Sequence, residues 1–336
     1  MAKHRRSAKY ECMLLYVDEP QLISLVANKA RFVALAVPPA DEQRFVVTTV
    51  SKRDWASYLR GSIDLRYLFT VPEMRQTYTF DLSSMKEGKV MMDPRTEPLT
   101  EDLLPSPRFF AENHTEKFVE EDLPEDVERL IIDGEWELQE FGQFQQRYAD
   151  IYAFSSAIRC WSDQDISEDR KKSIAGSFRG RPFQGGFSYV HLFKDLNDNV
   201  PYSDRIHLNE IQYASPGFVD ILGVDDIFST VNESIENLLA NRRHITKSYK
   251  ELYSFLSKNK YLNLAGDDYD PNTSADKYIK EGTESFAKLL KLPDLQAVVE
   301  LSEKNTLVTA KVVLSYYRRL LEATSFFSQG RASFKD

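Results

Sequence analysis

The sequence is poor in the residue types that cross-link small folds or build metal sites. Its 336 residues include two cysteines and five histidines. Cys12 and Cys160 lie far apart, each within apolar sequence, so they resemble small buried hydrophobes and predict neither a disulfide framework nor a zinc site. No two histidines have the spacing of zinc ligands. We therefore expect no bound metal and a reducing compartment.

Long apolar runs and targeting segments are missing as well. No stretch approaches the roughly 18 apolar residues that span a bilayer. The basic residues 1–9 are not followed by a long apolar core, so no secretory signal is expected. The sequence predicts a cytoplasmic protein that makes no contact with a membrane.

The common signatures of nucleotide binding and catalysis are also absent. No Gly-Lys-Ser/Thr follows a glycine loop, and no strand leads directly into Gly-x-Gly-x-x-Gly, which argues against a P-loop and a Rossmann fingerprint. A Gly-x-Ser-x-Gly elbow is not found either. The sequence therefore identifies no catalytic residue and implies no cofactor.

Acidic residues outnumber basic residues in the sequence. Lys and Arg number 43 against 52 Asp and Glu, for a net charge of −9. This balance argues against broad nonspecific binding to nucleic acid, although it leaves room for a local basic patch. The length and a 42% hydrophobic content suit two domains with substantial cores.

Residues 1–95 carry short β-patterned runs separated by tight turns, which predicts an antiparallel meander. Ser51 is expected to cap a helix that Gly61 ends, and Ile63, Leu65, Leu68 and Phe69 are expected in the core. We interpret this stretch as a small antiparallel sheet covered by a helix. The strands are predicted at residues 11–17, 22–27, 31–37, 44–50, 75–82 and 88–92.

Residues 96–128 differ in composition from the stretches on either side. They are rich in acidic residues and proline, and such a segment buries little apolar surface. We predict a solvated acidic linker whose middle is anchored to a domain around Phe109 and Phe110. Mimicry of nucleic-acid charge is the alternative.

The remaining residues, 129–336, are predicted to form a second α+β domain that ends in a helical bundle. Helical spacing begins at residue 125 and covers Val127, Leu130 and Ile131. A further helix is predicted at residues 136–150. Residues 151–161 fit either a strand or a buried helix, because periodicity does not distinguish the two.

The centre of this domain is predicted to be a β-hairpin. Residues 187–193 and 205–213 alternate apolar and polar side chains, and the segment between them is rich in turn formers. Ser215-Pro216-Gly217 is expected to end the second strand. From residue 218 the spacing becomes helical, with amphipathic helices to the end of the chain and a break between helices near residues 241–244.

A glycine-rich loop precedes this hairpin and is the candidate anion or nucleotide site. Glycine backbone amides and planar guanidinium groups suit phosphate or carboxylate. The alternative is a structural loop in which the arginines pair with local acids such as Asp195 or Asp204. The predicted site consists of Arg179, Arg181, Gly185, Gly186 and Ser188.

Two histidines offer an acid–base pair. His191 and His207 lie on the two strands of the predicted hairpin, where they would face each other. The alternative is that they are ordinary polar residues on a solvated face of the sheet.

Two stretches of the chain resemble bacterial proteins. After the first strands, residues 59–69 (LRGSIDLRYLF) resemble a small domain of unknown function from bacterial cytoplasmic proteins. The GGFS of residues 185–188, together with YASPG at residues 213–217, resembles a second module of similar proteins. The resemblance covers about half of the chain and implies a bacterial or phage-related intracellular protein. It implies no activity and assigns no functional residue.

The sequence leaves several functions open. The first is a non-enzymatic binding or regulatory protein that holds an anion at the central loop and meets a protein partner, or a second copy, through its terminal helices. The second is an enzyme acting on nucleotide or nucleic-acid phosphates, with Arg179 and Arg181 as phosphate clamps. A component of an antiphage or toxin–antitoxin locus is the third.

Overall fold

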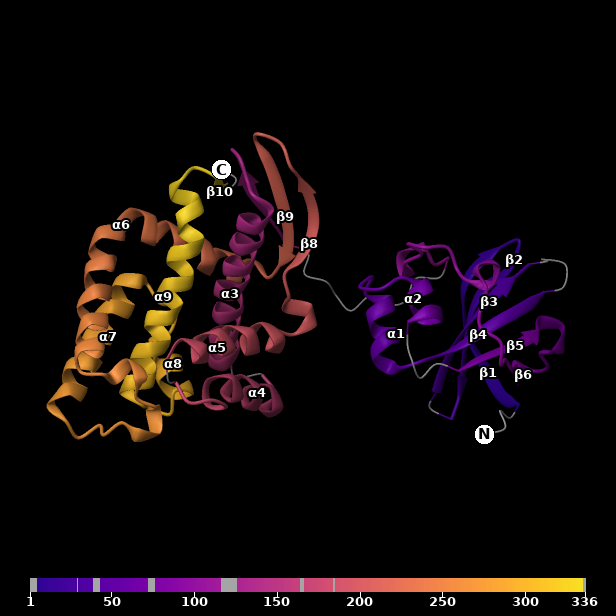
Figure 1. Ribbon diagram of the computed structural model, residues 1–336, viewed down its shortest axis with the longest axis horizontal. Coiled ribbons are helices and arrows are strands. Elements are labelled where there is room, and N and C mark those ends of the chain that lie inside the picture. Colours follow the sequence, from indigo (N-terminus) through magenta and orange to yellow (C-terminus); the bar gives the residue numbers. More distant parts are fainter. Residues whose placement is uncertain are drawn as a thin grey trace. The chain divides into compact units, whose positions relative to one another are not determined.

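The structure is a computed structural model of the chain, which divides into two compact units, Met1–Glu120 and Glu121–Asp336 (Figure 1). The predicted α+β class is confirmed, with antiparallel strands in the first unit and strands plus a helical region in the second. The side chains of residues 185–188 lie outside the described part. The structure describes residues 5–28, 30–38, 43–71, 76–115, 126–163, 166–183 and 185–334.

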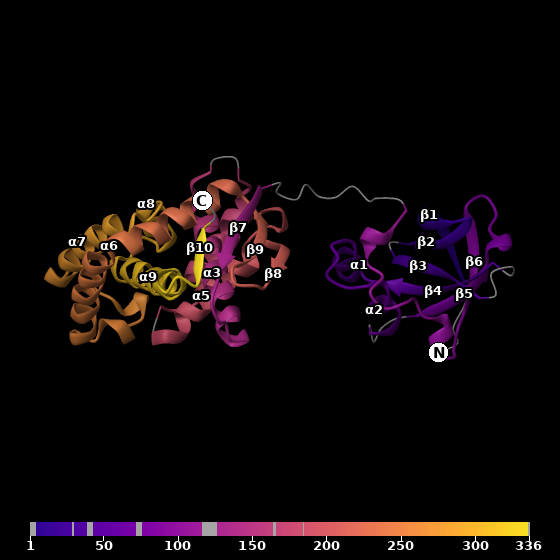
Figure 2. The same ribbon diagram turned by 90° about the horizontal axis from the view of Figure 1, so that it is seen from above.

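The first unit is a closed antiparallel barrel in which each strand pairs with the next along the chain (Figure 2). Pairing of β1 with β6, from Arg6 opposite Met92 to Lys9 opposite Lys89, closes the barrel. The predicted strands are present, and their sheet closes into a barrel, which the sequence did not indicate and which leaves no edge strand. The strands are β1 (Arg6–Val17), β2 (Glu19–Ala27), β3 (Ala30–Val37), β4 (Arg44–Val50), β5 (Thr77–Asp81) and β6 (Lys89–Pro94).

Two short helices, α1 (Lys52–Leu59) and α2 (Leu65–Thr70), pack on this barrel. The side chain of Ser51 accepts a hydrogen bond from the amide of Asp54 at 3.0 Å, which confirms the predicted cap. Gly61 follows the helix with a φ of +68°, a conformation that glycine adopts without strain. The predicted core residues Leu65, Leu68 and Phe69 are buried, and Ile63 packs against them.

Part of the acidic stretch packs on the barrel as well. The Leu65 amide donates to the Phe109 carbonyl at 2.7 Å, and the Thr115 amide donates to the Leu14 carbonyl at 2.8 Å. The predicted anchor at Phe109 is therefore confirmed, and the first unit extends well beyond residue 95. The apolar side chains of the stretch that contact the core beneath α1 and α2 are Leu99, Leu103, Leu104, Phe109 and Ala111.

The second unit contains a four-stranded antiparallel sheet in the order β10-β7-β9-β8 (Figure 2). The helix predicted from residue 125 is wrong. Residues 126–132 form a strand that pairs on both sides. Leu130 and Ile132 lie two residues apart on this strand, and both side chains are buried in the core. The helical spacing predicted from residue 218 is wrong over residues 218–223, where β9 forms. The strands are β7 (Asp126–Ile132), β8 (His207–Gln212), β9 (Gly217–Gly223) and β10 (Ala332–Phe334).

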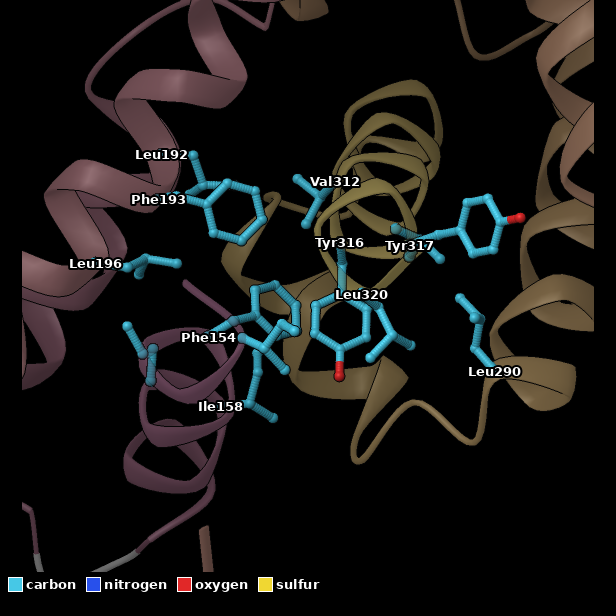
Figure 3. Close-up of a cluster of buried hydrophobic side chains, with 14 of the residues drawn as sticks. Phe154, Ile158, Leu192, Phe193, Leu196, Leu290, Val312, Tyr316, Tyr317 and Leu320 are labelled. Atoms are coloured by element: carbon cyan, nitrogen blue, oxygen red, sulfur yellow. The ribbon is translucent and has the colours of Figure 1, made fainter. Parts of the chain in front are cut away.

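Helices form the rest of the second unit. Residues 151–161, which fitted either a strand or a helix, lie in the helix α3. The inner face of α3 packs on α5 and α9. At this contact the ring centroids of Phe154 and Tyr316 are 4.6 Å apart (Figure 3). The helices are α3 (Leu138–Ser162), α4 (Glu168–Arg179), α5 (Gly185–Asn199), α6 (Asp225–Lys258), α7 (Ser274–Leu290), α8 (Leu295–Leu301) and α9 (Thr306–Ser328).

The predicted central hairpin is half wrong. Residues 187–193 belong to helix α5, and only the second predicted strand exists, as β8. The buried residues of α5 follow helical spacing: Tyr189, Leu192, Phe193 and Leu196. Ser215-Pro216, joined by a cis peptide bond, lies in the turn between β8 and β9.

The terminal helices bury their apolar faces against one another. α9 packs against α3, α6 and α7, and most of its residues are buried. The break predicted near residue 241 is confirmed as a kink inside α6, where Asn241 has a φ of −115° and a ψ of 16°. Across the helices that the structure describes, none combines the length and hydropathy needed to cross a membrane.

Candidate functional site

The arginine predicted to clamp an anion is engaged in packing. Arg179 ends α4, and its guanidinium donates to the carbonyls of Glu300 at 3.0 Å and Leu301 at 3.2 Å, at the end of α8. Its Nε also lies 3.4 Å from a carboxylate oxygen of Glu303. A cation at a helix C-terminus satisfies carbonyls that have no partner within the helix. Two of the planar donors needed for a phosphate are thus already used.

The other members of the predicted anion site lie between the end of α4 and the first turn of α5. Arg181 is exposed in the loop after α4. Gly185 and Gly186 begin α5, and the side chain of Ser188 lies outside the described residues. An anion site in this loop stays a prediction.

The proposed pairing of the two histidines across a hairpin is wrong. His191 lies on helix α5, whereas His207 opens strand β8. The His207 ring packs edge-on against Tyr202, with centroids 5.0 Å apart, and its Nε2 lies 3.4 Å from the Tyr202 carbonyl oxygen. These contacts fit a structural role better than proton transfer.

A groove runs along the second half of α6, with Tyr278 of α7 on its wall. It has a volume of about 970 Å³. Basic side chains dominate its lining, and Glu251 is the one acidic residue among the described groups that line it. The basic residues are Arg242, Arg243, Lys247, Lys250 and Lys258.

This basic surface follows from a division of charge within α6. The first half of the helix carries Asp225, Asp226, Glu233 and Glu236 and no lysine or arginine. After the kink at Asn241 the charge reverses. A helix dipole favours cations only near the last turn, so it does not account for arginines in the middle of the helix.

Four of the cations form a stripe. Residues 243, 247, 250, 254 and 258 recur at intervals of three or four, which places Arg243, Lys247, Lys250 and Lys258 along one side of the helix, with Ser254 between the last two lysines. At 1.5 Å per residue, the stripe is about 22 Å long. The sequence contains this spacing of cations, but the prediction at residues 241–244 was limited to a break between helices.

Most of these cations have no acidic partner. Lys247 lies 3.9 Å from Glu251, an exposed pair of little strength. Arg242, Arg243, Lys250 and Lys258 form no ion pair with any residue that the structure describes. Unpaired, exposed cations lined up in a groove create a positive potential available to an external anion.

Aromatic side chains lie at the far end of the groove from the arginines. The Tyr278 ring is 47% exposed and packs over Phe255, with centroids 4.2 Å apart and planes inclined by 36°. Phe255 in turn contacts Tyr261. The groove therefore combines a row of positive charge with a supported aromatic surface.

One buried carboxylate elsewhere in the second unit is satisfied internally. Asp150 lies 3.1 Å from Arg319 and 3.4 Å from Arg147, and the amide of Asn197 donates to it at 2.9 Å. Burial raises the pKa of Asp150, and the two arginines oppose that rise. Such a closed network suits packing rather than ligand binding.

Cys160 does not have the environment of a reactive thiol. It is buried, and its Sγ accepts a hydrogen bond from Arg170 at 3.1 Å. Burial raises the pKa of the thiol, against the lowering effect of Arg170. Among the described residues, no group of three His, Cys, Asp or Glu side chains is arranged to hold a metal ion.

Comparison with protein-family models, curated proteins and solved structures finds no match to this chain. The resemblance to bacterial proteins thus stays a prediction. The groove along α6 is the candidate site on physical grounds alone.

Proposed function

We propose that this chain is a binding protein that holds a phosphate-rich polyanion in the α6 groove. The stripe of unpaired cations carries this proposal. A chain with a net charge of −9 repels polyanions over most of its surface, so a local basic groove also fixes where and how one would bind.

The proposed function is still anion binding, as expected from the sequence, but the proposed site is the α6 groove and not the loop after α4. Anion binding was expected at Arg179 and Arg181, but Arg179 donates to helix carbonyls, whereas the α6 cations face the groove. The alternative of an enzyme acting on phosphates has less support, because the hairpin that was expected to bring His191 and His207 face to face is not formed. A bacterial origin, a cytoplasmic location and a role in a defence locus remain proposals from the resemblance.

Charge reversal in the groove tests the proposal. We expect the purified chain to bind immobilised heparin, and the double variant Arg243→Glu/Lys250→Glu to elute at much lower salt. Both side chains are exposed, so the fold should tolerate the change. Lys194→Glu, at an exposed lysine of α5, reverses one charge outside the groove where the double variant reverses two, and it should cost far less than either single groove variant, Arg243→Glu or Lys250→Glu.

Arg179→Ala is the second control, because that arginine is engaged with α8. It should leave heparin affinity unchanged. Equal losses in the groove variant and in Lys194→Glu, or no binding by the wild-type chain, would refute the proposal.

A further inference from the structure

We infer that the polyanion is single-stranded nucleic acid, with its backbone along the cations and a base stacked on Tyr278. This inference rests on the proposed function and narrows it to one class of ligand. Its basis is the joint presence of a cationic stripe and an exposed, supported ring in one groove.

The ring distinguishes among polyanions. Heparin, polyphosphate and an acidic peptide would make ionic contacts with the cations but would provide no base to stack on the Tyr278 ring. A duplex also hides the faces of its bases within its own stack. A single strand presents phosphates and base faces together, and proteins that bind such strands combine a positive groove with aromatic side chains.

The support of the ring matters as much as its exposure. Tyr278 rests on Phe255, and Phe255 is held by its position on α6 next to the cations. A ring already packed on one side loses little freedom when a base stacks on the other. Its hydroxyl is not needed for stacking, so phenylalanine should replace it.

The geometry also sets the order of contacts along the groove. The arginines lie just after the kink at Asn241, and Phe255 lies about 18 Å further along the helix from Arg243. Lys247 and Lys250 lie between them. Several phosphates would therefore be held between the arginines and the stacked base, with no requirement for a particular base.

The test uses fluorescence anisotropy with labelled single-stranded DNA and RNA of about 16 nucleotides, the matching duplex, and unlabelled heparin or polyglutamate as competitors. We expect the single strands to bind more tightly than the duplex. Tyr278→Ala should weaken single-strand binding about tenfold, since one stacked base is lost. Tyr278→Phe should bind like the wild type.

The control for exposure is Tyr213→Ala, which removes an exposed tyrosine outside the groove. It should have no effect on single-strand binding. Heparin affinity should be the same in the Tyr278→Ala variant and the wild type.

The outcomes separate the inference from the proposed function. Equal affinity for single strand and duplex, with Tyr278→Ala unchanged, would overturn the inference while the groove remained a polyanion site. Binding of polyglutamate but of no oligonucleotide would overturn it in favour of an acidic protein partner. No binding to any of these ligands would overturn both.

Discussion

The ammonium group of Lys311 donates hydrogen bonds to the carbonyl of Phe183 at 2.7 Å and to that of Leu264 at 2.5 Å. The side chain lies on α9 and is 0% exposed. It ties the loop before α5 to the loop after α6, and no carboxylate pairs with it among the described residues. Burial lowers the pKa of Lys311 from 10.5 to about 8.

This buried lysine predicts a gain in stability at alkaline pH. Between the lowered pKa near 8 and the unfolded value of 10.5, the unfolded chain keeps the proton that the folded chain has released. The free energy of unfolding contributed by Lys311 therefore rises with pH across this window. From pH 7 to 10.5 we expect the wild type to gain up to about 3 kcal/mol relative to Lys311→Met.

Urea denaturation of both proteins at several pH values measures that difference. Titration of the buried tyrosines is common to both proteins and cancels. A difference that does not change with pH would contradict the assignment.

His114 predicts a pH dependence of the same sign in the acid range, where stability falls as the pH falls. Its Nε2 shares a 2.7 Å hydrogen bond with the Tyr58 hydroxyl, and burial lowers its pKa from 6.5 to about 4. As pH falls from 6.5 to 4, the unfolded chain takes up a proton that the folded chain refuses, so stability is lost across that window. The loss should be up to about 3 kcal/mol greater in the wild type than in His114→Gln.

Denaturation curves of the two proteins at pH 4 and pH 7 provide the test. The acidic side chains of the chain titrate in both proteins and largely cancel. If the two proteins lost the same stability, His114 would not be the group that titrates.

Two glycines predict opposite effects of the same substitution. A Cβ on Gly223 would lie 2.4 Å and 2.8 Å from ring atoms of Phe228 and 3.1 Å from the Tyr152 hydroxyl. That hydroxyl already accepts from the Val224 amide and donates to the Asp204 carbonyl, so it has little room to move. Gly223→Ala should therefore destabilise the second unit by about 1–3 kcal/mol.

Gly176 is the matched control. It lies inside helix α4, and a Cβ there would meet no atom within 4 Å. Gly176→Ala should stabilise the chain by about 0.5–1 kcal/mol, because alanine has the higher helix propensity. Thermal unfolding should shift in opposite directions for the two variants, and a shared direction would contradict the packing around Gly223.

Local signals account for what was predictable from the sequence. Short turns indicated the meander of the first unit, and Ser51 marked the start of α1 because its side chain caps that helix. Closure of the barrel was not predictable, since β1 and β6 are paired by contacts some 80 residues apart along the chain. The sequence gives no sign of that pairing.

The errors in the second unit have the same physical origin. The apolar positions of α5 fit a strand at residues 187–193 and a helix over residues 189–196, so only packing against α3 decides between them. The local spacing of apolar residues in β7 fits a helix. The strands that pair with it, β9 and β10, come from residues 217–223 and 332–334, so local spacing does not reveal the pairing. Tertiary pairing overrides local preference in such segments.

The candidate site was missed for a different reason. Its signal was in the sequence as a spacing of cations on a helix, but the groove also needs Tyr278 from α7, whose position depends on the fold. The glycines and arginines of residues 178–186 have the composition of an anion-binding loop. The structure shows Arg179 donating its hydrogen bonds to α8.

The most direct test of the account is the salt dependence of binding to a labelled single strand. Four unpaired cations in the groove predict that log K falls against log salt with a slope of about −3. Arg243→Glu/Lys250→Glu should weaken binding and flatten that slope, whereas Lys194→Glu should change neither. An affinity that does not depend on salt concentration, or a slope that the double variant leaves unchanged, would show that the α6 groove is not the site.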